Sequence, residues 1–292
     1  MLERRLRPRG PYSLRLSGAL RSDATRIARD GVVRAVLDVD GRLQLVAARQ
    51  LADGAVHVRA PSEEALDRMR FVLGLDDDHS PFLRRFACDP LLGRTITELR
   101  GLRPMRLPTV AHALARALCG QLIESRRARA IERTIVRAAM PATEGLHAPL
   151  TASALGRFSA AELRALGLHA RRCATLLRLC REIDLERLRE LPTDTVAVRL
   201  QRERGLGPWS VGVICLEGLG RHERGLVGDL GLVKLCSALN GRRAEASDTE
   251  QLLEAYGDWA GLAGVYLLAG WGRGLVPVRR PPRRAFPPHL AA

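Results

Sequence analysis

Two patterns of apolar residues divide the sequence, and they constrain its fold more than any other feature. Residues 32–39 are typical of a strand, Asp40-Gly41 of a two-residue hairpin turn, and residues 43–46 of the returning strand. Residues 12–16 and 55–58 are expected to form two further short strands. Farther along, strand signals stop and a helical spacing of apolar residues takes over. We therefore expect an α+β chain: a small N-terminal mixed α/β domain with an antiparallel sheet, followed by an all-α domain.

The length of 292 residues suits about two domains. Ser62-Glu63-Glu64, directly after Pro61, predicts the start of a helix that runs through Leu73. The end of the chain is rich in proline and arginine and is expected to be irregular. The predicted parts are a domain over 1–80, a helical domain over 81–276 and a tail over 277–292.

The polar segment 76–81 separates the two domains. Its three aspartates beside His79 form a group that is able to bind a metal ion. Because the segment lies between two apolar stretches, a linker with a helix cap is the favoured interpretation.

Helical signals fill the second domain. Two capping boxes, at residues 159–162 and 247–250, predict the starts of two helices. One apolar stripe at helical spacing comprises Val110, Ala113, Leu114, Ala117, Leu118 and Leu122. Further helices are expected over 171–181, 195–203, 209–219 and 229–239.

The chain is strongly basic, with 47 Lys and Arg residues against 32 Asp and Glu and a net charge of +15. Lys234 is its only lysine. Arginine binds phosphate bidentately and stacks on bases, so this bias suits nucleic acid or an acidic partner. A GC-rich genome would produce the same bias, and composition alone leaves both explanations open.

The six cysteines lie far apart within apolar segments and contain no Cys-x-x-Cys pair. They predict buried free thiols and neither a zinc site nor an iron–sulfur cluster. No apolar run is long enough for a membrane helix, and the basic start is not followed by the apolar stretch of a signal peptide. A cytoplasmic, nucleoid-associated monomer without membrane contact is expected.

The segment Arg204-Gly205-Leu206-Gly207-Pro208-Trp209-Ser210 lies between two expected helices. Two glycines around one apolar residue allow a tight turn, and Pro208 suits the first turn of the next helix. Such a helix–hairpin–helix presents backbone N–H groups to a DNA phosphate without reading the base sequence. Glycines also end many helices as plain caps, so the motif has a purely structural alternative.

A second motif, at residues 227–232, lies about one helix farther along. Its Asp229 stands at the start of an expected helix, where aspartate is a common cap. Together with the hairpin and with residues 118–123, this pattern resembles the 3-methyladenine DNA glycosylase II family of the helix–hairpin–helix, Gly-Pro-Asp superfamily.

The resemblance implies a role for each matching residue. Asp229 would be the catalytic carboxylate that stabilises an oxocarbenium-like sugar. Leu122 would be the wedge that fills the gap left by a flipped base, although its periodicity alone favours a core leucine. The base pocket would include Trp209, Gln121 and Tyr266. The DNA backbone would contact Gly205, Leu206, Gly207, Ser210 and Arg126.

Departures from the family pattern refine the expectation. Ser210 stands where bifunctional relatives have a lysine, which predicts a monofunctional enzyme without lyase activity. Val213 and Leu268 replace two expected aromatic residues, so the preference for alkylated purines is less firmly implied than glycosylase chemistry. No cofactor or iron–sulfur cluster is expected, and a monovalent cation at the hairpin is an open question.

The leading hypothesis is thus a monofunctional glycosylase that acts on damaged, in particular alkylated, bases in double-stranded DNA. The alternative is a non-catalytic helix–hairpin–helix DNA-binding protein derived from a glycosylase. Asp229 favours the first hypothesis, and the reduced number of pocket aromatics favours the second.

Overall fold

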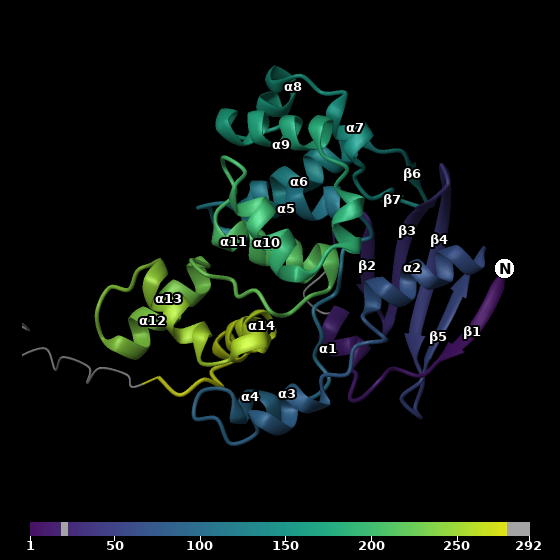
Figure 1. The fold of residues 1–292 in the computed structure, drawn as a ribbon. Coiled ribbons are helices and arrows are strands. Elements are labelled where there is room, and N and C mark those ends of the chain that lie inside the picture. Colours follow the sequence, from purple (N-terminus) through teal and green to yellow (C-terminus); the bar gives the residue numbers. More distant parts are fainter. Residues whose placement is uncertain (19–22, 279–292) are drawn as a thin grey trace, which may run out of the picture.

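Five antiparallel strands form the N-terminal part of the molecule, in the spatial order β1-β5-β4-β3-β2 (Figure 1). The structure, a computed structural model, describes residues 1–18 and 23–278. The strands are β1 (Leu2–Leu6), β2 (Arg26–Arg29), β3 (Val32–Val39), β4 (Arg42–Gln50) and β5 (Val56–Ala60). The sequence predicted β3, β4 and β5. It did not predict β1 and β2, which are arginine-rich edge strands without a run of apolar residues.

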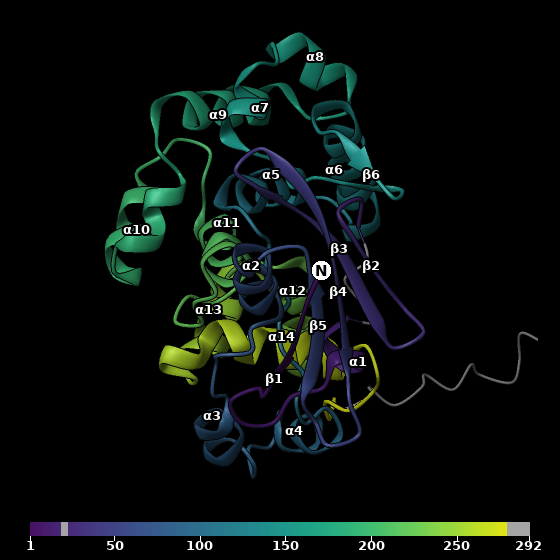
Figure 2. The same cartoon turned by 90° about the vertical axis from the view of Figure 1, so that its right-hand side faces the viewer.

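The turn between β3 and β4 has the predicted geometry. Asp40 and Gly41 have φ angles of 51° and 77°, as a two-residue type I′ turn requires. Helix α2 (Glu63–Leu73) begins after Ser62, whose hydroxyl accepts a hydrogen bond from the Ala65 amide at 3.2 Å. It packs on strands β3, β4 and β5, and Figure 2 shows it beside the sheet.

The expected strand at residues 12–16 is wrong, because the chain forms helix α1 (Leu14–Gly18) there. The Ser13 hydroxyl accepts from the Leu16 amide at 3.3 Å, and the Ser13 carbonyl accepts from the Ser17 amide at 3.0 Å. Serine at a helix start offers the backbone local bonds that a strand does not use.

Helices dominate the remainder of the described chain. They are α3 (Ser80–Arg85), α4 (Gly93–Glu98), α5 (Val110–Gly120), α6 (Ser125–Ala139), α7 (Ala152–Gly156), α8 (Ala160–Ala165), α9 (Ala170–Glu182), α10 (Thr193–Gln201), α11 (Pro208–Val213), α12 (Leu230–Asn240), α13 (Ala246–Glu254) and α14 (Ala260–Trp271). Short 3-10 turns occupy Glu186–Glu190 (η1) and Gly257–Trp259 (η3), and a wider π-helical segment, Ile214–Leu219 (η2), continues α11.

Two details of this part differ from expectation. It is not all-α, because β6 (Ala142–Thr143) and β7 (Leu146–His147) form a small hairpin. The capping box at residues 159–162 is confirmed, whereas the one at 247–250 is wrong. Helix α13 begins earlier because Glu245 and Asp248 cap it reciprocally.

Helix α5 lies at the centre of the larger hydrophobic core and is buried on nearly all sides. A second core fills the space between the sheet and α2 and includes Leu37, Met69 and Met105. Val36, which faces the opposite side of β3, belongs to the larger core. The sheet therefore packs against α2 on one face and against the helical part on the other.

No helix in the described ranges is long and apolar enough to span a membrane. Of the irregular tail expected over 277–292, residues 279–292 lie outside the described residues.

Candidate active site

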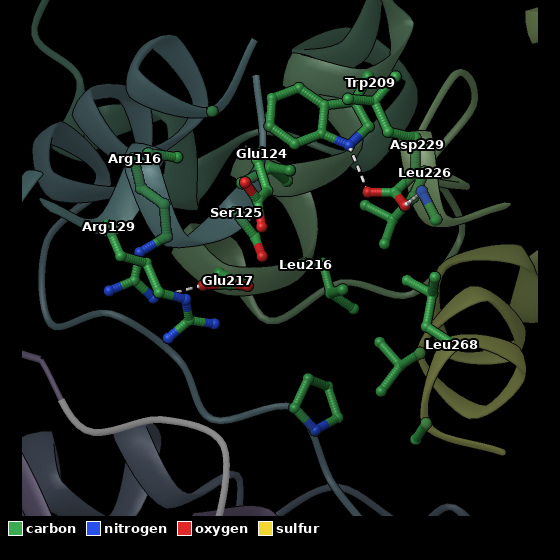
Figure 3. A pocket seen from close by; sticks show the side chains of 18 of the residues that line it. Arg116, Glu124, Ser125, Arg129, Trp209, Leu216, Glu217, Leu226, Asp229 and Leu268 are labelled. Carbon is green, nitrogen blue, oxygen red and sulfur yellow. Dashed lines mark hydrogen bonds and ion pairs between the residues drawn. The ribbon is translucent and has the colours of Figure 1, made fainter. Parts of the chain in front are cut away.

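A cavity of about 540 Å³ opens among several helix ends (Figure 3). Its walls come from the loop between α5 and α6, from α11 and η2, from the loop that enters α12, and from α14. Trp209 and Asp229, which the sequence singled out separately, both line it. The cavity therefore brings together the two motifs on which the sequence-based hypothesis depends.

Asp229 is the N-cap of helix α12, and hydrogen bonds fix both of its carboxylate oxygens. Oδ1 accepts from the amides of Gly231 and Leu232 at 2.8 and 3.2 Å. Oδ2 accepts from Nε1 of Trp209 at 3.0 Å. All three partners donate, so they orient an ionised carboxylate whose remaining lone pairs are available to the cavity.

The indole of Trp209 is held by a close approach of helix α5. A Cβ at Gly120, the last residue of α5, would lie 2.5 Å from the far edge of the ring. Glycine at this position therefore lets the ring lie against the helix end while its N–H reaches Asp229. Figure 3 shows the indole and the carboxylate joined at one side of the cavity.

The spacing of Leu122 suggested that it belongs to the apolar stripe of α5. It does not, because the helix ends at Gly120. Its side chain is 84% exposed, and its φ of 52° is uncommon for a leucine. Arg172 holds the loop by donating to the carbonyl of Gln121 at 2.5 Å. The loop thus presents an apolar side chain to solvent at the mouth of the cavity.

The glycine hairpin between α10 and α11 forms as expected. Gly205 has a φ of 96°, and a Cβ there would lie 2.4 Å from Oγ1 of Thr175, so both conformation and space require glycine. Gly207 faces open space instead. The first hydrogen bond of α11 runs from the amide of Val211 to the carbonyl of Gly207, so the earlier amides of Trp209 and Ser210 are not used inside the helix.

Two other residues expected to contact the DNA backbone make bonds inside the protein. The amide of Leu206 donates to the carbonyl of Glu203 at 3.0 Å, and its side chain is buried. The Ser210 side chain is 2% exposed and accepts from Nε2 of Gln121 at 3.0 Å. Ser210 is therefore buried beside the hairpin, with its hydroxyl bonded to Gln121.

Two expected pocket residues do not line the cavity. Gln121 lies against the hairpin, where its side-chain amide also donates to the carbonyl of Gly205 at 2.7 Å. Tyr266 is fully buried, and its hydroxyl donates to the carbonyl of Leu102 at 3.0 Å. It packs on Phe82 in the core and has no access to a base.

A buried charge cluster forms the opposite end of the cavity, and its centre is Arg116 on α5. The guanidinium contacts Asp23 at 2.7 Å, Glu132 at 2.8 Å and Glu217 at 2.7 Å. Burial opposes ionisation here, but Arg26 and Arg116 outweigh it and hold the pKa of Asp23 well below its usual range. Burial likewise opposes ionisation of Glu132, and Arg116 outweighs it to lower that pKa. No pattern in the sequence predicted this charge cluster.

Three further residues complete the wall. Val213 and Leu268, which replace expected aromatic residues, both line the cavity, and Trp209 is the only aromatic among its described lining residues. Lys234, the only lysine, also lines it, although no sequence pattern assigned it a role. Arg126 is exposed in the first turn of α6, beside the Leu122 loop.

No family model matches the sequence, and no curated protein matches it. Solved structures do match the fold. The 3-methyladenine DNA glycosylase of Archaeoglobus fulgidus has a TM-score of 0.79 at 21% identity, over 92% of this chain and 98% of its own. The 8-oxoguanine glycosylase/lyase of Clostridium acetobutylicum, solved with double-stranded DNA containing cytosine opposite 8-oxoguanine, has a TM-score of 0.74 at 15% identity, over 94% and 99%.

The 3-methyladenine DNA glycosylase of Schizosaccharomyces pombe, in complex with abasic DNA, is more distant. Its TM-score is 0.50 at 19% identity, over 70% of this chain and 96% of its own. The chain therefore has the fold of the helix–hairpin–helix DNA glycosylases, as the sequence predicted.

Proposed function

We propose that the chain is a monofunctional DNA glycosylase that flips a damaged base, an alkylated purine by preference, out of duplex DNA and hydrolyses its N-glycosidic bond. The observation that carries the proposal is the fixed carboxylate of Asp229 on the wall of a base-sized cavity, bonded to Trp209 at 3.0 Å. The glycosylase fold and the hairpin beside the cavity support it.

The chemistry follows from the placement of that carboxylate. As the bond between base and sugar breaks, positive charge develops on C1′ and the ring oxygen of the sugar. An ionised carboxylate that is already oriented stabilises this charge without reorganising during the reaction. Because its hydrogen bonds fix Asp229, the carboxylate does not turn away as the base leaves with the electron pair of the broken bond. A water molecule then adds to C1′ and releases a proton to the solvent.

DNA would approach across the face that carries the hairpin and the Leu122 loop. The amides at the start of α11 suit a phosphate oxygen, and exposed Arg126 adds positive charge beside the Leu122 loop. The exposed leucine side chain suits the space that a flipped nucleotide leaves in the base stack. None of these contacts reads the base sequence.

The cavity favours damaged bases whose glycosidic bond breaks easily over bases that would depend on tight binding in the cavity. Its described lining includes one aromatic side chain, so the stacking that would hold a base is limited. The lining acids Glu124, Glu132, Glu217 and Asp229 are matched in number by Arg103, Arg116, Arg129 and Lys234. A cationic base therefore gains little from net charge, and its advantage lies in its weakened glycosidic bond. Alkylation of a purine ring nitrogen creates such a base.

Release of free base from methylated duplex DNA tests the proposed function. We expect purified protein to release 7-methylguanine or 3-methyladenine, detected by chromatography of the ethanol-soluble fraction. Duplexes with 8-oxoguanine or uracil serve as a comparison panel. No release from any lesion, with duplex binding intact, would instead support the non-catalytic DNA-binding protein.

Borohydride trapping tests the absence of lyase activity. We expect no covalent enzyme–DNA adduct, because the Ser210 hydroxyl is buried and is unable to form an imine. The single lysine makes the test sharp, since Lys234 is the only side-chain amine in the chain. An adduct that disappears in Lys234→Arg would identify Lys234 as a Schiff-base nucleophile and contradict the monofunctional proposal.

Gly207→Leu tests the hairpin as the phosphate anchor. Gly207 has a φ of −94°, and a Cβ at this position would meet only open space, so the variant is expected to fold normally. Its side chain would stand where a phosphate approaches. We expect affinity for duplex DNA to fall by about tenfold or more on unrelated sequences, and Gly207→Ala to lose less. Fluorescence anisotropy measures both, and unchanged affinity in Gly207→Leu would exclude the hairpin as the anchor.

A further inference from the structure

A group of three metal-ligating side chains lies outside the cavity. Asp77 and His79 belong to the polar segment before α3, and His222 follows the wide turn η2. One ligand atom from each lies within 4.8 Å of the others. The position of residues 76–81 between two apolar stretches favoured a linker, and nothing in the sequence indicated that His222, far along the chain, lies beside them.

The distances fit a metal ion better than they fit a hydrogen-bond network. Nε2 of His79 and Nε2 of His222 are 3.0 Å apart, and Oδ2 of Asp77 lies 3.8 Å and 3.7 Å from them. The two nitrogens lie at hydrogen-bond distance from each other, whereas Oδ2 of Asp77 is farther from both rings than a normal hydrogen bond. A triangle with these sides has a centre about 2.1 Å from all three atoms, which is the usual length of zinc bonds to histidine and aspartate.

The surroundings hold both imidazoles in place. The His79 side chain is 2% exposed. The ring of Trp259 stacks on His222 with an interplanar angle of 17° and covers it from one side. Imidazoles that are already ordered lose little conformational freedom when they bind an ion.

We propose that Asp77, His79 and His222 form a structural site for a divalent transition metal, zinc in the first instance. The side chains of Asp77 and His222 remain 21% and 13% exposed, which leaves room for water as the fourth ligand. The ion would tie the segment between α2 and α3 to the loop that leads from η2 toward Asp229. Its role would be to stabilise this junction.

Arg106 affects the affinity of the site for a metal ion in two opposite ways. Its guanidinium donates to Oδ2 of Asp77 and, at 3.1 Å, to the carbonyl of Gly220. It thereby orients the carboxylate, but its positive charge opposes a second cation nearby. Two imidazole nitrogen ligands favour zinc over magnesium or calcium, because those ions prefer oxygen.

Metal content of the full chain tests the site and does not depend on glycosylase activity. The protein is produced without a histidine tag, depleted with chelator, reloaded with zinc and passed through a desalting column. We expect about one zinc per chain by mass spectrometry. We also expect an increase of about 5 °C in Tm when zinc is in large excess over its dissociation constant.

Matched variants locate the ion. His222→Gln and His79→Gln are expected to retain less than a tenth of the zinc and to lose the Tm response. His57→Gln serves as the control, since His57 also lies near a carboxylate, 3.3 Å from Glu3, but has no such partners. Equal zinc in His222→Gln and in the wild type would overturn the proposal.

Cobalt substitution tests the ligands of the site in the wild-type protein, so the test does not depend on whether a variant folds. In the wild-type protein, cobalt bound to two histidines and an aspartate gives weak visible bands without the intense near-ultraviolet band of cobalt–thiolate bonds. That spectrum supports the site. A thiolate band would place the metal on the cysteines instead, and a spectrum of free aqueous cobalt would exclude a site; either result rejects the proposal.

Discussion

Asp229→Asn is expected to reduce the rate of base release from methylated duplex DNA by about 10²–10³-fold, the range found when one preorganised electrostatic group is removed. The asparagine oxygen is able to replace Oδ1 as the cap of α12, so the helix start is retained. Two things are lost, namely the negative charge and the acceptor for Trp209, because the new amide nitrogen would face the indole N–H. Single-turnover release under saturating enzyme measures the loss.

The chain offers a matched control in Asp89. This aspartate is equally half-buried, accepts from the amides of Leu91 and Leu92 at 2.9 and 2.7 Å, and has Tyr256 as an aromatic donor. It does not line the cavity. Asp89→Asn is therefore expected to release base at the wild-type rate. An equal loss in both variants would show that a capping bond, and not the charge at the sugar, explains the effect.

Arg116→Met is expected to lower the free energy of unfolding by about 3–5 kcal/mol, because it leaves the buried carboxylates of Asp23, Glu132 and Glu217 without their shared cation. Methionine nearly fills the space of the arginine stem, so a cavity is not the main cost. Urea unfolding at pH 7 measures the change. Arg199→Met, at an exposed position on α10, is the control and should change stability by less than about 0.5 kcal/mol.

The same variant has a characteristic pH dependence. In the wild type the pKa values of Asp23 and Glu132 are lowered, so their stabilising contribution is complete at neutral pH and is lost only when pH falls through the acidic range. Without Arg116, both pKa values rise relative to the wild type, because Glu132 loses the charge that most lowers its pKa and Asp23 keeps Arg26 but loses its second arginine. These carboxyls then take up protons at a higher pH than in the wild type, which removes the penalty of buried negative charge as pH falls. The difference between variant and wild type should therefore shrink from pH 7 to pH 5, and a constant difference would contradict the electrostatic explanation.

Local signals account for the parts of the site that the sequence predicted. The hairpin requires Gly205 for its conformation and Pro208 for its helix start, and Asp229 marks the start of α12. Each of these is a short-range feature with its own residue preference. The hydrogen bond between Trp209 and Asp229 joins two such features only twenty residues apart, so one structural unit already determines most of the geometry.

The errors arise where the local pattern is uninformative. Helix α14 is apolar on nearly every side, so periodicity does not indicate that Tyr266 faces the core and Leu268 the cavity. The spacing of Leu122 continued the stripe of α5, yet the helix ended two residues earlier. Arg116 meets partners 93 and 101 residues away, and no sequence pattern pairs a particular arginine with them in a chain so rich in arginine.

The wide turn η2 determines where Glu217 lies on the cavity wall. In Ile214–Leu219 the amide of Gly220 donates to the carbonyl of Cys215, five residues back, so this turn holds one residue more than an α-helical turn. That extra residue rotates the next part of the chain by about 100° relative to a regular helix, and Glu217 lies within the turn, on the cavity wall. A one-codon deletion there would restore a regular helix while moving this carboxylate away from Arg116. Deletion of one residue in η2 is therefore expected to disturb the charge cluster at the end of the cavity more than a substitution in the same turn.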